Sequence, residues 1–255
     1  MPALITLITD FGTRDSYVAQ VKGVLLRMGP PDLRIVDLGH EIAPQNVREG
    51  AYFMRSVLPH FPAGTIHLAV VDPGVGSARR AIAAETSGQL VLGPDNGLLG
   101  FVLVSGARVH GIEHAAAAPA SSTFHARDVF APAAARLACG ETIAALGAKV
   151  SDPVVLSWPA PVLAPDAVRG EIVHVDRFGN LISNIERAHL SSRSAARVVL
   201  LGRDLGPLRD HYAQSGPGEL LALFGSDGLL EVAARDASAG AITGAGVGSP
   251  LTVEL

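Results

Sequence analysis

Two kinds of segment alternate over the first 150 residues, and this alternation constrains the fold more than any other feature. Short apolar runs rich in β-branched residues predict buried strands, and segments whose apolar residues recur every three or four positions predict helices. Such alternation is typical of a mostly parallel sheet covered by helices on both faces. The predicted strands are 4–9, 34–38, 65–71, 81–86 and 89–92. The first predicted helix is capped by Asp15 and Ser16 and carries Val18, Val21, Leu25 and Met28. Two further helices are predicted at 45–58 and 127–138.

A proline-rich segment ends this pattern. Residues 152–167 contain four prolines and the only tryptophan, which predicts an extended linker. We therefore expect an α/β N-terminal domain with a mostly parallel sheet at 1–151, a linker at 152–167, and a smaller all-β, barrel-like C-terminal domain at 168–255. A low-complexity connector is expected at 115–119. The strands predicted for the C-terminal domain are 170–175, 197–201, 219–224, 229–233 and 251–255.

The charge content argues against several functional classes. Only 17% of the residues are charged, against about 25% in an average domain, and the net charge is −4, without the basic excess of nucleic-acid-binding proteins. No apolar run approaches the ~18 residues of a membrane span, and the N-terminus does not resemble a signal peptide, so we expect a cytoplasmic protein. The single cysteine, Cys139, excludes an internal disulfide and a Cys-based zinc site. Low charge and a mean hydropathy of +0.33 favour an oligomer.

Acidic residues stand at the ends of predicted strands. Asp10 follows strand 4–9, Asp72 follows strand 65–71, and Asp15 stands at the start of the first helix. Ligands of open α/β sheets bind outside the carboxyl ends of the strands. These three carboxylates therefore form a candidate site for a cation or for ribose hydroxyls, unless Asp10 and Asp15 serve only as turn and cap residues.

Other segments carry side chains capable of chemistry. A glycine-rich loop joins Asp72 to Arg79, and Arg79 is expected to fold back onto Asp72 as a bidentate pair. His125 precedes a predicted helix, where it could act as a general base, act as an orienting donor, or be structural. The segment 176–184 combines an acid, an aromatic ring and two asparagines, which could bind a planar base or form an ordinary polar turn.

Five motifs occur in order along nearly the whole chain. They are Thr9-Asp10-Phe11-Gly12 with Asp15 and Tyr17, Val71-Asp72-Pro73-Gly74-Val75-Gly76 with Arg79, Pro94-Asp95-Asn96-Gly97, Phe124-His125-Ala126-Arg127-Asp128, and Asp176-Arg177-Phe178-Gly179-Asn180 with Asn184. Together they resemble the S-adenosyl-L-methionine (SAM) hydroxide adenosyltransferases, also called adenosine-forming SAM hydrolases. These enzymes are related to others that fluorinate or chlorinate the same substrate. The halogenating relatives carry tyrosines where this chain has Asp72 and His125, which argues against a halogenase.

The resemblance implies hydrolysis of SAM to adenosine and L-methionine through attack of an activated water or hydroxide at ribose C5′. It implies SAM as substrate, no cofactor, no metal, and a homotrimer whose active sites lie between the N-domain of one subunit and the C-domain of the next. The implied catalytic residues, which ready the water, are Asp72, Arg79 and His125. The implied substrate-binding residues are Asp10 for the ribose, Asp15 and Asp176 near the methionine part, Phe124 in the pocket, Phe178 and Asn180 on the adenine side, and Ser226 at the methionine carboxylate.

Other functions stay open on the residues alone. They are a halide-using SAM adenosyltransferase, a non-catalytic adenosine or SAM binder, and a metal-dependent hydrolase built on Asp10, Asp72 and His125. The chain also departs from the family where Leu229 replaces a usual tyrosine and where Ala234-Arg235-Asp236-Ala237 replaces an Asn-rich adenine segment. Adenine recognition there is therefore expected to use backbone groups.

Overall fold

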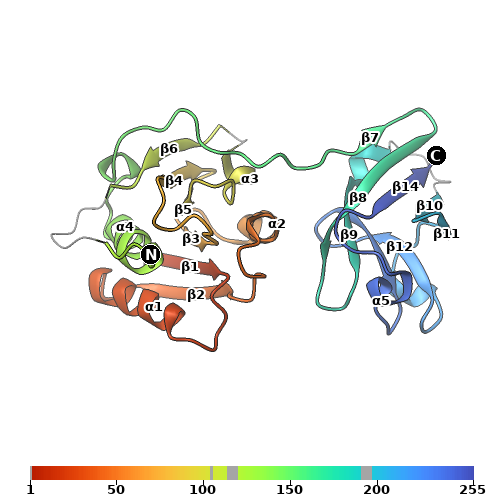
Figure 1. The fold of residues 1–255 in the computed structure, drawn as a ribbon, viewed down its shortest axis with the longest axis horizontal. Helices are drawn as coiled ribbons and strands as arrows, with labels where there is room; N and C mark the ends of the chain where they lie inside the picture. Colours follow the sequence, from red (N-terminus) through yellow and green to blue (C-terminus); the bar gives the residue numbers. More distant parts are fainter. Residues whose placement is uncertain (1, 104–105, 114–119, 191–196) are drawn as a thin grey trace. The chain divides into compact units, whose positions relative to one another are not determined.

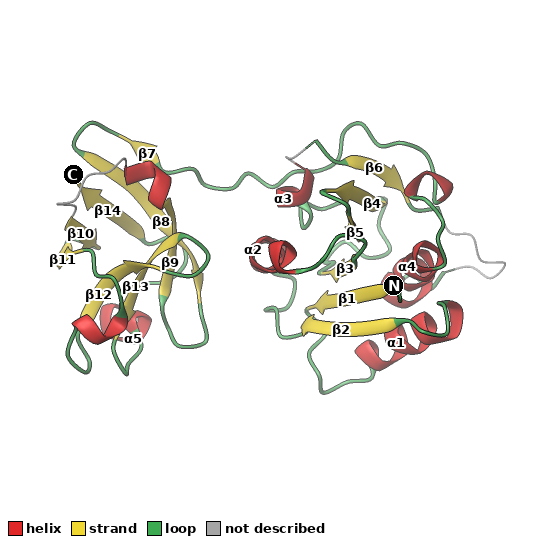
Figure 2. Ribbon diagram, turned by 180° about the vertical axis from the view of Figure 1, so that it is seen from behind, coloured by secondary structure: helices red, strands yellow, loops and turns green. Residues whose placement is uncertain are grey.

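The chain forms two compact units. The structure is a computed structural model that describes residues 2–103, 106–113, 120–190 and 197–255, so the predicted connector at 115–119 lies outside the described residues. The contacts between Cα atoms divide the chain into Met1–Leu156 and Ser157–Leu255, and Figures 1 and 2 show the elements of each unit. The division falls inside the segment predicted as a linker, whose outer bounds remain a prediction.

The first unit is built on a six-stranded sheet with the order β2-β1-β3-β5-β4-β6. The neighbours β2, β1, β3 and β5 run parallel, while β4 is antiparallel to both β5 and β6. The prediction of a mostly parallel sheet is therefore confirmed. The strands are β1 (Leu4–Thr9), β2 (Arg34–Gly39), β3 (Ile66–Val70), β4 (Ala81–Thr86), β5 (Gln89–Pro94) and β6 (Arg108–Gly111), of which the sequence prediction missed β6.

Helices cover both faces of this sheet. On one face, α1 and α4 pack against alternate residues of the strands, with Ile5 and Leu7 of β1 in the shared core. On the other face, Ile8 joins a second core with Met54 of α2. This arrangement follows from strands that are apolar on both sides. The helices are α1 (Tyr17–Met28), α2 (Val47–Val57), α3 (Gly100–Leu103) and α4 (Ala131–Ala138), with short 3₁₀ turns at Leu58–His60 and Ile143–Ala145.

Two helix predictions need correction. The N-cap of α1 is Ser16, but its side chain makes no capping hydrogen bond, and Asp15 lies outside the helix. The predicted helix 127–138 begins instead with a π-helical turn, Ala126–Phe130, before α4. Such turns place one extra residue in the helix and are frequent at functional sites. This turn immediately follows His125.

The second unit is an antiparallel, barrel-like sheet with the order β11-β10-β14-β8-β9-β13-β12, to which β7 adds by pairing with β8. The outermost strands, β11 and β12, also lie close to each other, which nearly closes the sheet. The all-β prediction is confirmed (Figure 2). The elements are β7 (Val162–Leu163), β8 (Ala167–Val175), β9 (Leu181–Glu186), β10 (Arg197–Leu200), β11 (Arg203–Pro207), β12 (Leu220–Phe224), β13 (Leu229–Ala234), β14 (Pro250–Glu254), α5 (Ala239–Thr243) and the 3₁₀ turns Arg187–Leu190 and Tyr212–Gln214.

The sequence pattern does not predict strand β9, because its polar residues are also typical of a turn. Ser183 and Asn184 are buried in this strand. Tertiary partners satisfy them: the Ser183 hydroxyl donates to Leu230 O at 2.8 Å, and the Asn184 amide donates to Pro159 O at 2.9 Å.

Among all the residues the structure describes, no helix combines the length and hydrophobicity needed to cross a bilayer.

Candidate active site

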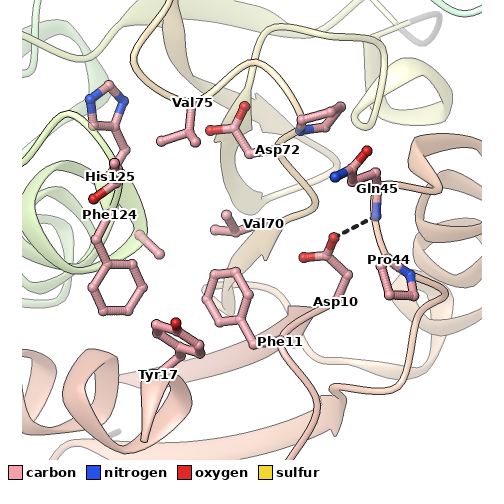
Figure 3. Close-up of a pocket in the computed structure, with 13 residues that line it drawn as sticks. Asp10, Phe11, Tyr17, Pro44, Gln45, Val70, Asp72, Val75, Phe124 and His125 are labelled. Carbon is pink, nitrogen blue, oxygen red and sulfur yellow. Dashed lines mark hydrogen bonds between the residues drawn. The ribbon is translucent and has the colours of Figure 1, made fainter. Parts of the chain in front are cut away.

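A pocket of about 360 Å³ opens at the carboxyl ends of β1 and β3. These strands are parallel neighbours, with Thr9 paired to Val70 in register, so the residues that follow them meet at one edge of the sheet. Asp10 and Asp72 both line the pocket, as the positions of the acids predicted. The other lining residues are Phe11, Tyr17, Pro44, Gln45, Val70, Pro73, Val75, Thr123, Phe124, His125 and Ala126 (Figure 3).

Asp72, Arg79 and His125 form one connected set. Arg79 Nε donates to Asp72 Oδ1 at 2.9 Å and Oδ2 at 3.1 Å, and a terminal nitrogen of Arg79 also binds Oδ2. The predicted bidentate pair is therefore confirmed. The Asp72 side chain is 5% exposed and the Arg79 side chain 10% exposed, so the two charges neutralise each other with little solvent between them.

The same guanidinium reaches His125. Its NH2 group lies 2.9 Å from His125 Nδ1. Arginine has no acceptor and keeps its protons at any ordinary pH, so Nδ1 must be the acceptor in this hydrogen bond. The ring is then neutral and carries its proton on Nε2. In this state His125 can donate a hydrogen bond but has no lone pair left with which to take a proton.

A glycine allows the loop that carries Arg79 to approach the loop that carries His125. Gly76 has φ +78°, and a Cβ added there would lie 2.3 Å from Ser122 O. Any other residue would strain the backbone and push the two loops apart. The second loop is anchored from its other side, because Ser121 N donates to Asp128 Oδ2 at 2.9 Å. The two loops are thus held together around the Arg79–His125 contact.

The rim around Asp10 is also ordered. Asp10 Oδ2 accepts a hydrogen bond from the backbone N–H of Gln45 at 2.7 Å, drawn as a dashed line in Figure 3. Gln45 has φ +67°, an uncommon left-handed conformation for a residue with a side chain. A carboxylate offers about four lone-pair sites, so Asp10 keeps the capacity to accept further hydrogen bonds from a ligand.

Three aromatic rings form the opposite side of the pocket. Phe11, Tyr17 and Phe124 lie 5.3–5.9 Å apart, centre to centre, and are tilted or nearly perpendicular to one another. In Figure 3 they gather on one side, with Asp72 and His125 on the other. The pocket therefore combines an apolar, π-rich wall with a wall of hydrogen-bonding groups. Aromatic faces of this kind attract cations.

Comparison with known proteins decides the family. The model of the SAM hydroxide adenosyltransferase N-terminal domain matches residues 5–147, and the model of the C-terminal domain matches residues 170–252. The chain belongs to the SAM hydroxide adenosyltransferase family. The family predicted from the five motifs is therefore confirmed.

Individual relatives match over nearly their whole length. An (R)-S-adenosyl-L-methionine hydrolase of Thermus thermophilus is 41% identical, covering 97% of this chain and 98% of the relative. A fluorinase of an Actinoplanes species is 29% identical, covering 91% of this chain and 92% of the relative. A crystal structure of an uncharacterized conserved protein from Thermotoga maritima is 33% identical, with a TM-score of 0.90 over 98% of this chain and 99% of that chain.

Not all residues predicted for this SAM hydroxide adenosyltransferase line the pocket. Asp15 is exposed and is not among the lining residues. Four others belong to the second unit: Asp176, Phe178, Asn180 and Ser226. Asp176 accepts hydrogen bonds at 2.9–3.0 Å from Phe178 N and from both nitrogens of Asn180, so it shapes its own turn. Phe178 is 76% exposed, Asn180 is buried, and Ser226 is exposed.

Sequence reasoning missed two features of the pocket. Gln45, which binds Asp10, was assigned only to the start of a helix, and the pocket side of Pro44 was not foreseen. The signal is weak: proline is common at the second position of a turn, but the left-handed residue that follows it in a type II turn is usually Gly or Asn and not Gln. Within the described part of the chain, no group of three or more His, Cys, Asp and Glu side chains is arranged to hold a metal ion.

Proposed function

We propose that this protein hydrolyses SAM to adenosine and L-methionine, using the pocket at the ends of β1 and β3. The observation that carries the proposal is the connected set Asp72–Arg79–His125, of which Asp72 and His125 line the pocket, in a chain that belongs to the SAM hydroxide adenosyltransferase family. Four relatives that are 32–41% identical are named as hydrolases of the (R) form of SAM. The (R) sulfonium is therefore the expected substrate.

The difficult part of this reaction is the activation of the nucleophile. Water oxygen forms a bond to ribose C5′ while the bond from C5′ to the sulfonium sulfur breaks, and its electron pair goes to sulfur. Methionine leaves as a neutral thioether, so no general acid is required for the leaving group. The water must lose a proton, and nearby positive charge and hydrogen-bond donors favour the hydroxide form.

The connected set fits this demand. Arg79 supplies a fixed positive charge, and Asp72 holds the guanidinium in one orientation. His125, protonated at Nε2, donates a hydrogen bond to the water oxygen as negative charge develops there. Since the ring is a donor in this state, the proton leaves to solvent and not to His125. Positioning of the water for in-line attack supplies the rest of the acceleration.

Substrate binding divides between the two walls. The Asp10 carboxylate, fixed by Gln45 N, accepts hydrogen bonds from the ribose hydroxyls. The rings of Phe11, Tyr17 and Phe124 offer π faces to the sulfonium cation, an interaction worth ~0.5–2 kcal/mol depending on solvation. The neutral thioether product lacks that attraction, which favours its release.

The remaining contacts are proposed on the family resemblance. In a homotrimer, a neighbouring subunit would supply Phe178 and Asn180 to adenine and Asp176 and Ser226 to the methionine part. One observation supports this: Phe178 is largely exposed. Asp15 is proposed to bind the methionine ammonium. Light scattering coupled to size exclusion tests the trimer.

The reaction itself is tested with separate (R) and (S) samples of SAM in water enriched in ¹⁸O. We expect adenosine and methionine from the (R) form, with the heavy oxygen in the 5′-hydroxyl of adenosine. Heavy oxygen in any other product, or formation of 5′-methylthioadenosine faster than in a sample without enzyme, would show attack elsewhere and overturn the proposal. Added chloride or fluoride is expected to yield no 5′-halo-nucleoside. A halogenated product would favour a halide-using adenosyltransferase instead.

A further inference from the structure

A second network of side chains, formed by Asp37, His40 and Thr9, lies beneath the Asp10 rim and is distinct from the set at Arg79. His40 Nδ1 and Thr9 Oγ1 share a hydrogen bond of 2.9 Å. His40 Nε2 lies 3.1 Å from Asp37 Oδ1, although the contact is misaligned and forms no regular hydrogen bond within the described residues. Asp37 Oδ2 in turn binds Lys22 Nζ at 2.5 Å. The chain thus runs from the surface to the last residue of β1.

The order of these groups resembles the triads that activate a hydroxyl nucleophile, but the surroundings exclude that role. Thr9 is 3% exposed and His40 is 6% exposed, and neither lines the pocket. The Thr9 hydroxyl also accepts a hydrogen bond from Phe11 N at 3.2 Å. A substrate atom therefore has no path to this oxygen, and the network acts on the backbone around it.

This backbone is the turn at residues 9–12, which forms part of the pocket rim. Thr9 immediately precedes Asp10, and its hydroxyl holds the N–H of Phe11. The carbonyl of His40 accepts a hydrogen bond from Gly12 N at 2.7 Å. One residue, His40, therefore holds the turn 9–12 at both ends, through its ring at Thr9 and through its backbone at Gly12. Asp10 is the residue between these two points.

We infer that His40 is a positioning residue that fixes the Asp10 carboxylate for the ribose hydroxyls of the substrate, through Thr9 and the turn 9–12. The inference rests on the proposed function, because the ribose contact of Asp10 belongs to it. The set at Arg79 prepares the nucleophile, whereas the His40 network sets the position of the ribose and hence of C5′. Its loss should weaken ribose binding much more than it slows the chemical step.

Two substitutions of His40 distinguish the loss of the whole ring from the loss of its hydrogen bond to Thr9. His40→Leu removes both ring contacts, and we expect KM for SAM and Kd for adenosine to rise about tenfold, with kcat changed less than about threefold. His40→Asn keeps a polar atom close to the place of Nδ1 and can still bind Thr9. We expect His40→Asn to stay within about threefold of the wild type in KM and Kd.

The chain offers a matched control in the same strand. Thr6 Oγ1 and His67 Nδ1 form a similar buried hydrogen bond, 2.7 Å long, and Thr6 lies three residues before Thr9 in β1. His67→Leu therefore removes a comparable buried contact and is expected to lower the melting temperature without changing KM. A rise in KM for His67→Leu equal to that of His40→Leu would overturn the inference.

A double-mutant cycle tests the route through Asp10. If His40 acts by placing this carboxylate, His40→Leu should change the Kd for adenosine less than about threefold once Asp10→Asn is present. If the changes in Kd caused by the two substitutions multiply in the double variant, the inference is overturned. It is also overturned if His40→Asn melts like the wild type but does not restore binding. Absence of adenosine from the wild-type reaction would instead overturn the proposed function itself.

Discussion

The role of His125 can be tested by substitutions that keep one ring nitrogen at a time. Arg79 donates to Nδ1 at 2.9 Å, which leaves the ring proton on Nε2. The amide of asparagine reaches roughly the place of Nδ1, and the amide of glutamine roughly that of Nε2. His125→Asn therefore keeps an acceptor for Arg79, His125→Gln keeps a donor near Nε2, and His125→Ala keeps neither.

The expected magnitudes follow from the two hydrogen bonds. Loss of a donor that stabilises developing negative charge costs about 10²–10³ in kcat, or about 2.7–4 kcal/mol. A hydrogen bond from a charged donor such as Arg79 contributes about 1.5–3 kcal/mol to stability. For a chain of this size, that corresponds to about 3–12 °C in Tm. We thus expect His125→Asn to melt close to the wild type while losing about 10²–10³ in kcat.

The complementary variant completes the design. We expect His125→Gln to keep kcat within about tenfold of the wild type while its Tm falls with that of His125→Ala. The assay is adenosine release at saturating SAM, followed by chromatography, beside thermal unfolding by circular dichroism. If His125→Asn retained full kcat, the ring would serve only to hold Arg79. If His125→Gln were as inactive as His125→Ala, donation from Nε2 would be refuted.

Two further predictions concern stability and pH. Burial lowers the pKa of His67 from 6.5 to about 4; because the unfolded chain then binds more protons, stability should fall by about 3 kcal/mol as pH drops from 6.5 to 4. Urea unfolding should show this slope in the wild type and not in His67→Leu, and equal slopes would contradict it. Burial raises the pKa of Glu231, whose Oε1 accepts from Tyr212 Oη at 2.5 Å. The folded state then binds the extra proton, so stability should fall as pH rises above 4.5. Glu231→Gln should therefore exceed the wild type in Tm at pH 8 but not at pH 4, and the same Tm difference at both pH values would count against this reasoning.

The sheet and the placement of its acids were predictable because each depends on local pattern. Apolar runs identify β1 and β3, and parallel strands bring their carboxyl ends to one edge. Asp10 and Asp72 therefore had to lie close to each other once the strand pairing was parallel. The Asp72–Arg79 pair was predictable for a similar reason, because a short glycine-rich loop joins its members.

Other features depend on contacts between distant segments and have no local signal. Ser183 and Asn184 read as turn residues, yet they are buried in β9, because Leu230 O and Pro159 O accept their hydrogen bonds. The left-handed backbone of Gln45 is stabilised by Asp10, 35 residues away in the sequence. Neither partner can be inferred from the neighbouring residues. The link from Arg79 to His125 likewise joins two loops, and only the family resemblance grouped those residues in advance.

A buried ion pair in a chain with so few charges calls for a reason beyond stability, since such pairs contribute little net free energy to folding. The substrate supplies one. SAM carries a positive sulfonium, and an unpaired guanidinium would repel it: two unit charges about 8 Å apart, at an effective dielectric constant of about 20, repel by about 2 kcal/mol. Asp72 offsets much of that charge toward the sulfonium, while Arg79 stays next to the water site and holds His125, whose Nε2–H donates to the hydroxide.

Asp72→Asn should therefore discriminate between ligands by charge. Sinefungin carries an ammonium in place of the sulfonium, whereas S-adenosylhomocysteine is neutral at that position. We expect the ratio of the Kd for sinefungin to the Kd for S-adenosylhomocysteine to be about thirtyfold higher in the variant than in the wild type. Calorimetry on one folded sample of the variant gives both values, so any loss of stability from the unpaired Arg79 cancels in the ratio. Equal changes for the two ligands would show that Asp72 only shapes the loop, because a purely structural defect has no means of sensing the charge of the ligand.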